Sequence, residues 1–236
     1  MGKPHYYNRA AEWERGVAIN YKFKAFPEGT AIFDVERGQL PGIRSRFWQT
    51  DTAVAKNSWC YVKDQAYKSA DAIIGDLIDI VSKNGALLLN IGPRPDGTIP
   101  EHEEELLLDI GRWLKVNGEA IYSTRPWTVF GEGPTHVEGG SFTDAERAPF
   151  TSHDIRFTTR GETLYAIVLA SPESKTVTIT SLATGANLYA PEIAKVELLG
   201  RSEELHFQRT SEALAIEMPS DYTGKQAFAL RITPAK

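Results

Sequence analysis

The first half of the chain alternates short apolar runs with stretches of helical periodicity. Three apolar runs predict short strands at residues 16–21, 31–36 and 86–91. The third run is apolar at nearly every position and is bounded by turn residues, which is typical of a strand covered on both faces, as in a parallel sheet. This half therefore predicts strand–helix units.

Two helices accompany these strands. Residues 65–83 carry apolar side chains at i, i+3, i+4, i+7, i+8 and i+11 counted from Ala70, which form one continuous helical face. A second helix is expected just after Pro100, because several glutamates crowd its positive end and an apolar stripe follows. Asn84-Gly85 and Asn117-Gly118 are the expected stop signals of the two helices.

The second half shows only short strands separated by glycine and polar turns. Seven are predicted, at residues 154–159, 163–170, 176–180, 194–199, 205–209, 213–218 and 226–233. Antiparallel strands at this spacing indicate a β-sandwich. Residues 131–150, rich in Gly, Pro, Thr and Glu, are expected to lead into it. Two domains are predicted, residues 1–125 and 126–236.

Three parallel strands cannot close a (β/α)8 barrel, which needs eight. The first half is therefore either a small α/β layer or the C-terminal part of a larger barrel.

Composition narrows the class of protein without choosing a function. The chain has 236 residues, 42% of them hydrophobic and 24% charged, with a net charge of −5. These values are typical of a globular protein, and a mildly acidic chain argues against nucleic acid as the main partner. No apolar run is long enough to span a bilayer. Cys60 is the single cysteine, so neither an internal disulfide nor a cysteine-based zinc site is expected, and the five histidines show no ligand spacing.

Long sequence blocks resemble the α-L-fucosidases of glycoside hydrolase family 29. The blocks are residues 81–100 (VSKNGALLLNIGPRPDGTIP), residues 110–122 (IGRWLKVNGEAIY) and residues 124–127 (TRPW). Residues 33–38 (FDVERG), 48–51 (WQTD) and 57–59 (NSW) resemble upstream segments of bacterial members of the family. The resemblance is dense over roughly the first 135 residues and weak beyond them.

The resemblance implies a fold, an activity and a partner. The fold is α/β plus all-β: the C-terminal part of a (β/α)8-like barrel followed by an antiparallel β-sandwich. The activity is retaining hydrolysis of terminal α-L-fucosyl linkages in fuco-oligosaccharides or glycoconjugates, with no metal or organic cofactor and no nucleic-acid or membrane partner. The family's aspartate nucleophile lies in a segment that resembles nothing in this chain, so it is expected upstream. Family members suggest a periplasmic or secreted location.

Glu36 is the expected acid/base residue. It is the charged end of an apolar strand, where catalytic groups of barrel enzymes lie, and it matches the glutamate of similar bacterial members. In a retaining mechanism it would stand about 5–5.5 Å from the nucleophile and protonate the leaving oxygen. The competing interpretation is a solvated glutamate paired with Arg37. Asp34, two residues earlier on the same strand face, is expected to support Glu36 at the substrate-binding site. The other interpretations of Asp34 are an alternative acid, a hydrogen-bonding partner or a strand-end cap.

Two further residues are expected at the substrate. Trp59 matches a tryptophan that lines the fucose pocket in the family, where an aromatic face can cover the apolar C6 methyl side; the alternative is a core tryptophan. Arg9 resembles an arginine that contacts the sugar, although a surface arginine is equally consistent with its sequence. Trp48 and Asp51 are expected on a long loop after Glu36, and Cys60 is expected to be a buried thiol. Asn90 ends its apolar strand, and its side chain is expected to hold neighbouring loops.

Two other hypotheses stay open. The chain could be a non-catalytic carbohydrate-binding or interaction module, which exposed aromatics at the sandwich tips would support. Tyr165, Phe207 and Phe228 lie within strand patterns, which indicates core positions instead. A partial barrel could also expose strand edges and self-associate.

Overall fold

The computed structural model describes residues 2–144, 147–172 and 174–235. Its N-terminal part holds a four-stranded parallel sheet in the order β1-β2-β3-β4. The strands are β1 (Asn20–Tyr21), β2 (Ile32–Glu36), β3 (Trp48–Ala53) and β4 (Gly85–Asn90). Three α-helices belong to this part: α1 (Gly2–Glu12), α2 (Ala70–Ser82) and α3 (Glu101–Asn117), the last followed by the short 3-10 helix η1 (Gly118–Ala120). The predicted parallel sheet is therefore present.

The C-terminal part consists of two antiparallel sheets. The larger has the order β5-β6-β7-β12-β9, and the smaller has the order β10-β11-β8. The larger sheet contains β5 (Arg125–Glu132), β6 (Ile155–Arg160), β7 (Thr163–Val168), β12 (Phe228–Pro234) and β9 (Ile193–Leu198). The smaller contains β10 (Phe207–Arg209), β11 (Leu214–Glu217) and β8 (Thr176–Ile179), and the 3-10 turns η2 (Thr180–Leu182) and η3 (Thr184–Ala186) follow β8. The predicted β-sandwich is confirmed.

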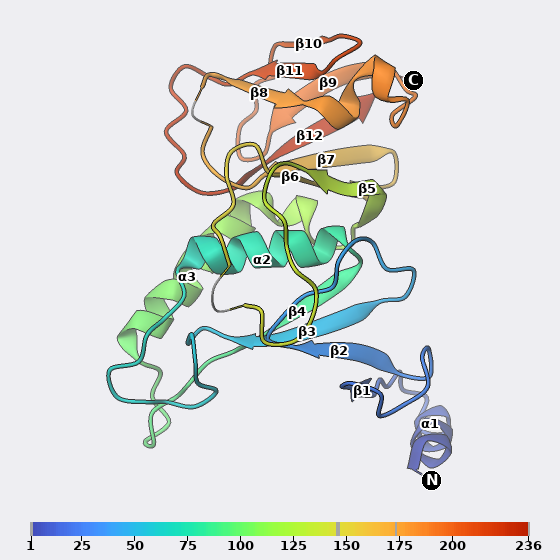
Figure 1. Ribbon diagram of the computed structural model, residues 1–236, viewed down its shortest axis with the longest axis vertical. Helices are drawn as coiled ribbons and strands as arrows, with labels where there is room; N and C mark the ends of the chain where they lie inside the picture. The colour runs from blue at the N-terminus through green and yellow to red at the C-terminus, as the bar shows by residue number, and fades with distance from the viewer. Residues whose placement is uncertain (1, 145–146, 173, 236) are drawn as a thin grey trace.

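The layers stack from the parallel sheet through the helices to the sandwich (Figure 1). One apolar core lies between the two antiparallel sheets and includes Phe157, Leu214 and Leu230. A second core joins α2 and α3 to the larger antiparallel sheet, where Ile73 of α2 and Ile167 of β7 belong to one cluster. The helices therefore bury apolar surface against both the parallel sheet and the sandwich.

Local sequence explains where α2 begins and ends. The Ser69 hydroxyl accepts a hydrogen bond from the Ala72 amide at 3.2 Å, which caps the first turn. The helix ends before Asn84, whose backbone is in the left-handed region at a φ of 72°. The predicted helix at residues 65–83 is thus correct in its body, but its first residues belong to the loop before the cap.

Strand β3 corrects the expected loop around Trp48 and Asp51. Every second residue of this strand is buried, namely Trp48, Thr50 and Thr52. The Thr50 hydroxyl donates to the backbone carbonyls of Val35 and Gly38, at 2.7 Å from each oxygen. The hydrogen bonds satisfy polar side chains that the hydrophobic pattern assigns to a loop. The parallel sheet therefore has four described strands, one more than expected.

Two other predicted boundaries were wrong. The first strand is only Asn20–Tyr21 rather than residues 16–21. Strand β5 occupies Arg125–Glu132, so residues 131 and 132 belong to the sandwich sheet rather than to its lead-in. It pairs with β6 at both ends with an irregular stretch between them, and this irregularity obscures the alternating pattern.

Candidate active site

The candidate site lies on the face of the parallel sheet that points away from α2. Register places Asp34 opposite Gln49 and Glu36 opposite Asp51, so their side chains share one face. Leu88, opposite Asp51 on the next strand, is on this face and is 54% exposed, whereas Leu87 and Leu89 pack into the helical core. In Figure 1, α2, α3 and the sandwich lie on the other side of this sheet. The polar face is therefore uncovered within the described chain.

Lys22 joins two carboxylates at the ends of neighbouring strands. Its Nζ lies 2.6 Å from Asp51 Oδ2 and 3.3 Å from Glu36 Oε2. Burial lowers the pKa of Lys22, but the hydrogen bond and attraction of Asp51, helped by Glu36, raise it above its ordinary value overall. Glu36 therefore sits in a polar, half-buried cluster and is paired with Lys22, not with Arg37 as in the competing interpretation.

Asp34 is the most buried acid of this cluster, at 7% exposure. Its Oδ1 has no hydrogen-bond partner among the described residues, and the same holds for Oδ1 of Asp51. Burial raises the pKa of Asp34, and the negative charge of Asp51 raises it further, with Lys22 opposing the shift. The cluster therefore holds two buried acceptor oxygens whose hydrogen-bonding capacity the described residues leave unused.

Trp59 lies beside the same cluster. Its ring centroid is 6.0 Å from Lys22 Nζ and 5.3 Å from Arg37 Cζ, both suitable for cation–π attraction. Asn90 at the end of β4 donates to the Trp59 carbonyl at 2.8 Å, so it holds the neighbouring loop as expected. Trp59 is half-buried rather than a core residue, and an aromatic face stands next to the carboxylates.

Arg9 is not brought to this cluster. Its contacts among the described residues are local: a 2.5 Å ion pair with Glu12 and a position 5.6 Å from the Trp13 ring. It lies on α1, at the far end of the molecule from the sandwich (Figure 1). Cys60 is exposed, so the expectation of a buried thiol was wrong.

Sequence reasoning missed Lys22 and Arg37. Lys22 directly follows β1, and β1 pairs in parallel with β2, so the residue after the strand falls beside Asp34. A charged residue at the carboxyl end of a short strand was the available signal, but the two-residue length of β1 concealed it. Arg37 is 6% exposed and has a φ of 49°, which nothing in its sequence context indicates.

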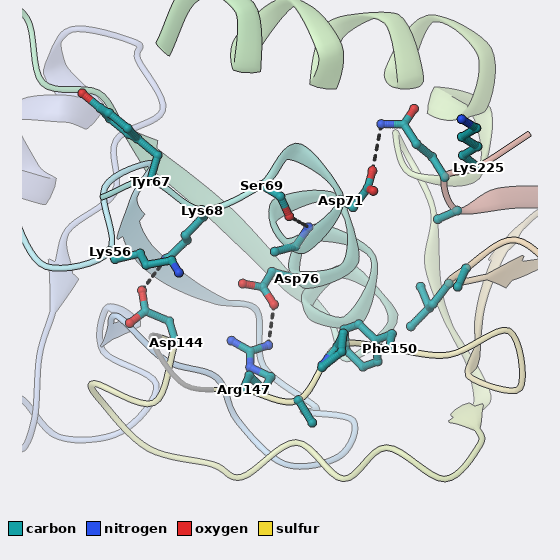
Figure 2. Close-up of a pocket in the computed structure, with 17 residues that line it drawn as sticks. Lys56, Tyr67, Lys68, Ser69, Asp71, Asp76, Asp144, Arg147, Phe150 and Lys225 are labelled. Atoms are coloured by element: carbon teal, nitrogen blue, oxygen red, sulfur yellow. Dashed lines mark hydrogen bonds and ion pairs between the residues drawn. The ribbon is translucent and has the colours of Figure 1, made fainter. Parts of the chain in front are cut away.

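A separate cavity of about 560 Å³ lies behind this site, between the start of α2, residues 147–150 and residues 225–227 (Figure 2). Within it, Arg147 pairs with Asp76 at 2.5 Å, and Gln226 donates to Asp71 at 2.9 Å. Neither Glu36 nor Trp59 lines it. These two contacts therefore connect α2 to the segments before β6 and β12.

No metal centre is evident in the part of the chain that the structure describes, because no group of three His, Cys, Asp or Glu side chains there could hold an ion. Among the described residues, no helix is both long and apolar enough to cross a membrane.

Parallel strands that end in carboxylates, with an antiparallel sandwich behind them, are the features of a barrel-type glycoside hydrolase. Comparison with known proteins agrees. The family model described as alpha-L-fucosidase matches residues 4–119, and that described as the alpha-L-fucosidase C-terminal domain matches residues 148–233. The chain belongs to the α-L-fucosidase family.

Individual relatives match most of the chain. Tissue alpha-L-fucosidases of Rattus norvegicus and Homo sapiens are each 32% identical to the chain over 197 residues, covering 79% and 80% of it. The solved Thermotoga maritima alpha-fucosidase in complex with fucose is 26% identical, with a TM-score of 0.72 over 97% of the chain. The chain spans 37% of the length of these two curated relatives and 47% of that solved structure. The fold is thus the C-terminal part of a barrel plus a β-sandwich, as the sequence resemblance implied.

Proposed function

We propose that this chain supplies the acid/base side of an α-L-fucosidase active site, with Glu36 as the acid/base residue. The position of Glu36 carries the proposal: it ends a parallel strand, on an open polar face, beside a second carboxylate and an aromatic ring. The relative with a bound fucose is a solved structure of the same fold, which supports a fucosyl substrate. We infer no nucleophile among the residues of this chain.

The proposed mechanism is retaining hydrolysis of a terminal α-L-fucosyl linkage. Protonated Glu36 would give its proton to the leaving oxygen as a nucleophilic carboxylate attacks the anomeric carbon. Glu36 would then remove a proton from the water that releases fucose from the enzyme. Asp34 and Asp51 would accept sugar hydroxyls, and Trp59 would cover the apolar side of the ring. A cofactor has no role in these steps.

The domain division fits this role. We infer that residues 1–125 belong to the barrel and residues 126–236 to the sandwich, which the start of β5 at Arg125 supports. A sandwich acting alone as a carbohydrate-binding module is less well supported. Tyr165 and Phe228 are 1% and 3% exposed, so these aromatics are core residues and are not available to a glycan.

A leaving-group comparison tests the proposal in an enzyme that contains this chain and a complete barrel. Glu36→Gln should slow hydrolysis of an alkyl fucoside by orders of magnitude, because its leaving oxygen needs a proton. The same substitution should slow hydrolysis of an aryl fucoside with an acidic phenol far less, since the phenolate leaves without needing a proton. Equal losses on both substrates would show that Glu36 is not the acid. The chain by itself should bind fucose at most weakly and turn over neither substrate.

A further inference from the structure

The backbone just after Glu36 is held by a segment that comes a hundred residues later. Three backbone N–H groups of residues 140–143 donate hydrogen bonds to the carbonyl oxygens of Glu36, Arg37 and Gln39. Each of these bonds is 2.8 Å long. The approach is close, because a Cβ at Gly38 would lie only 1.8 Å from a carbonyl oxygen of this segment. We call residues 140–144 the strap. The strap ties the end of β2 to the connection between β5 and β6 of the sandwich.

The Arg37 side chain connects the strap to the loop that bears Trp59. Its Nη2 donates to the Ala55 carbonyl at 3.1 Å and to the Lys56 carbonyl at 2.5 Å, and its Nε donates to Asp144 at 3.3 Å. The same guanidinium stacks on Trp59 at 5.3 Å from the ring centroid. The fork of donors and the planar face are both used, which a lysine could not reproduce.

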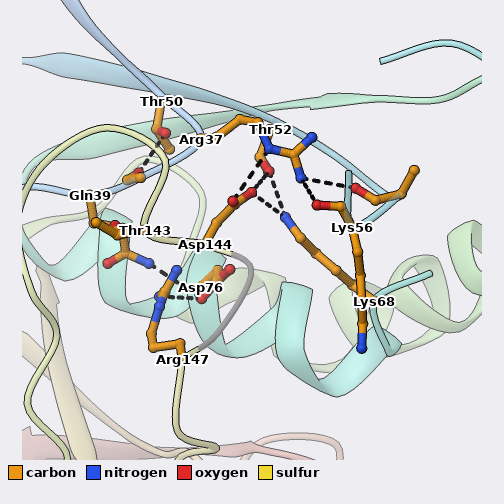
Figure 3. A network of polar contacts seen from close by, with 12 residues as sticks. Arg37, Gln39, Thr50, Thr52, Lys56, Lys68, Asp76, Thr143, Asp144 and Arg147 are labelled. Atoms are coloured by element: carbon orange, nitrogen blue, oxygen red, sulfur yellow. Dashed lines mark hydrogen bonds and ion pairs between the residues drawn. The ribbon is translucent and has the colours of Figure 1, made fainter. Parts of the chain in front are cut away.

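Asp144, the last residue of the strap, is the anchor of this network (Figure 3). Its side chain is 4% exposed and accepts from Lys68 Nζ and Thr52 Oγ1 at 2.5 Å each, in addition to Arg37. Burial raises the pKa of Asp144, but the hydrogen bonds from Lys68 and Thr52 outweigh it and leave the pKa below its ordinary value. The anchor is therefore a buried carboxylate that stays charged.

We propose that Arg37 is a positioning residue of the fucoside site, and that the strap sets its position through Asp144. Held by Asp144, Arg37 fixes the loop of residues 55–59 so that the Trp59 ring faces the Glu36 cluster. Arg37 itself is turned away from the sugar side and touches no reacting atom. This role rests on the proposed function, since it concerns the geometry of the same site. The contact between the strap and β2 therefore lets the sandwich contribute to the geometry of the site.

The single cysteine offers a direct readout on the chain as it is. Cys60 is exposed and follows Trp59, so a fluorophore can be attached to its thiol, and the fluorescence anisotropy of that probe reports the mobility of this loop. Arg37→Ala should lower this anisotropy under native conditions, because the loop loses the contacts that hold it. It should also change the emission of Trp59, isolated as the difference between each unlabelled protein and its Trp59→Phe counterpart. Arg37→Lys keeps the charge but loses the fork, so the anisotropy of its probe should fall between those of the parent and Arg37→Ala.

Arg156→Ala is the matched control. Arg156 is also buried and paired, with Asp79 at 2.6 Å, but its contacts lie between α2 and β6 and do not reach Trp59. This variant should lower the denaturant midpoint without changing the anisotropy of the Cys60 probe or the Trp59 emission of the native state. A lower midpoint alone changes the two signals only through a larger fraction of unfolded protein. If the changes in Arg37→Ala were no greater than that fraction explains, or if Arg156→Ala changed both signals equally, the proposal would be wrong.

A double variant tests the part played by the strap. Asp144→Asn should lower the anisotropy of the Cys60 probe, and the Asp144→Asn, Arg37→Ala pair should lower it no further than Arg37→Ala alone, because both act through one contact. Additive effects would refute the coupling. Fucose titration of an enzyme that contains this chain and a complete barrel separates this result from the proposed function. If Arg37→Ala changes the loop but that enzyme binds no fucose, Arg37 still positions the loop and the proposed sugar site is wrong. Binding that is as tight in Arg37→Ala as in the parent would overturn the positioning role.

Discussion

The ammonium group of Lys22 lies 3.3 Å from a carboxylate oxygen of Glu36, although the two residues belong to different strand ends. The same ammonium is 2.6 Å from Asp51, so one cation serves two acids on a face where a third, Asp34, is buried nearby. These charges act on the pKa of Asp34, and they lead to the first two predictions.

Lys22→Met should raise the pKa of Asp34 further. The positive charge of Lys22 opposes the upward shift that burial and Asp51 produce, so its removal leaves that shift uncompensated. Carbon-13 NMR titration of the aspartate carboxyl groups measures the change. Lys24→Met, at an exposed lysine two residues away, should leave the titration of Asp34 as it was. A constant Asp34 pKa in Lys22→Met would contradict the assignment of this cation.

Asp34→Asn should stabilise the fold at neutral pH, by about 1 kcal/mol. The carboxylate is buried, carries an unpartnered oxygen and faces the charge of Asp51, so a neutral side chain of the same shape avoids most of this cost. Urea unfolding at pH 7 measures the difference. A loss of stability would indicate that the charged form is favoured by contacts that outweigh its burial. A gain would fit a residue retained for binding rather than for folding.

The pH dependence of stability should contain a clear contribution from Asp76. Burial raises its pKa to about 6, with the attraction of Arg147 opposing the shift. The pKa of an aspartate in an unfolded chain is about 3.9. Between this pH and the folded value of about 6, Asp76 holds a proton in the folded state that it has released in the unfolded state. The contribution of this group to stability is therefore present at low pH and falls as pH rises towards 6.

Asp76→Asn isolates that contribution. The stability of the parent chain relative to Asp76→Asn should fall between about pH 4 and 6, by up to about 3 kcal/mol, and stay constant above that range. Urea midpoints measured across this window for both proteins give the difference directly. A difference that grew with rising pH would mean that Arg147 holds the pKa of Asp76 below its ordinary value instead.

Trp113→Ala should destabilise the barrel part and the sandwich together. Trp113 of α3 is 4% exposed, and its Nε1 donates to the Ala227 carbonyl at 2.6 Å, just before β12. Removing a buried tryptophan costs about 3–5 kcal/mol. Because the core of α2 and α3 includes residues of the sandwich sheet, far- and near-ultraviolet circular dichroism should still report one transition. Trp13→Ala, at a tryptophan that is 55% exposed, should change the midpoint little.

The sequence by itself determined the elements whose patterns are purely apolar. The helical face that starts at Ala70, the strand before Asn90 and the strands of the sandwich follow from periodicity, because burial of apolar side chains imposes it. It also placed Glu36 at a strand end and predicted that Asn90 holds a neighbouring loop, which the hydrogen bond to Trp59 confirms. Resemblance of long blocks identified the family before any geometry was known.

Only the tertiary structure decided how the polar residues are used. Strand β3 is hidden in the sequence because Thr50 and Thr52 are buried by hydrogen bonds rather than by apolarity. The pairing of Lys22 with Glu36, the separation of Arg9 from that cluster and the contact of Arg37 with Asp144 join residues far apart in the chain. Local sequence carries no signal for such contacts, because a hydrogen bond or ion pair depends on direction and distance across the packed elements, whereas apolar burial depends on composition and period alone.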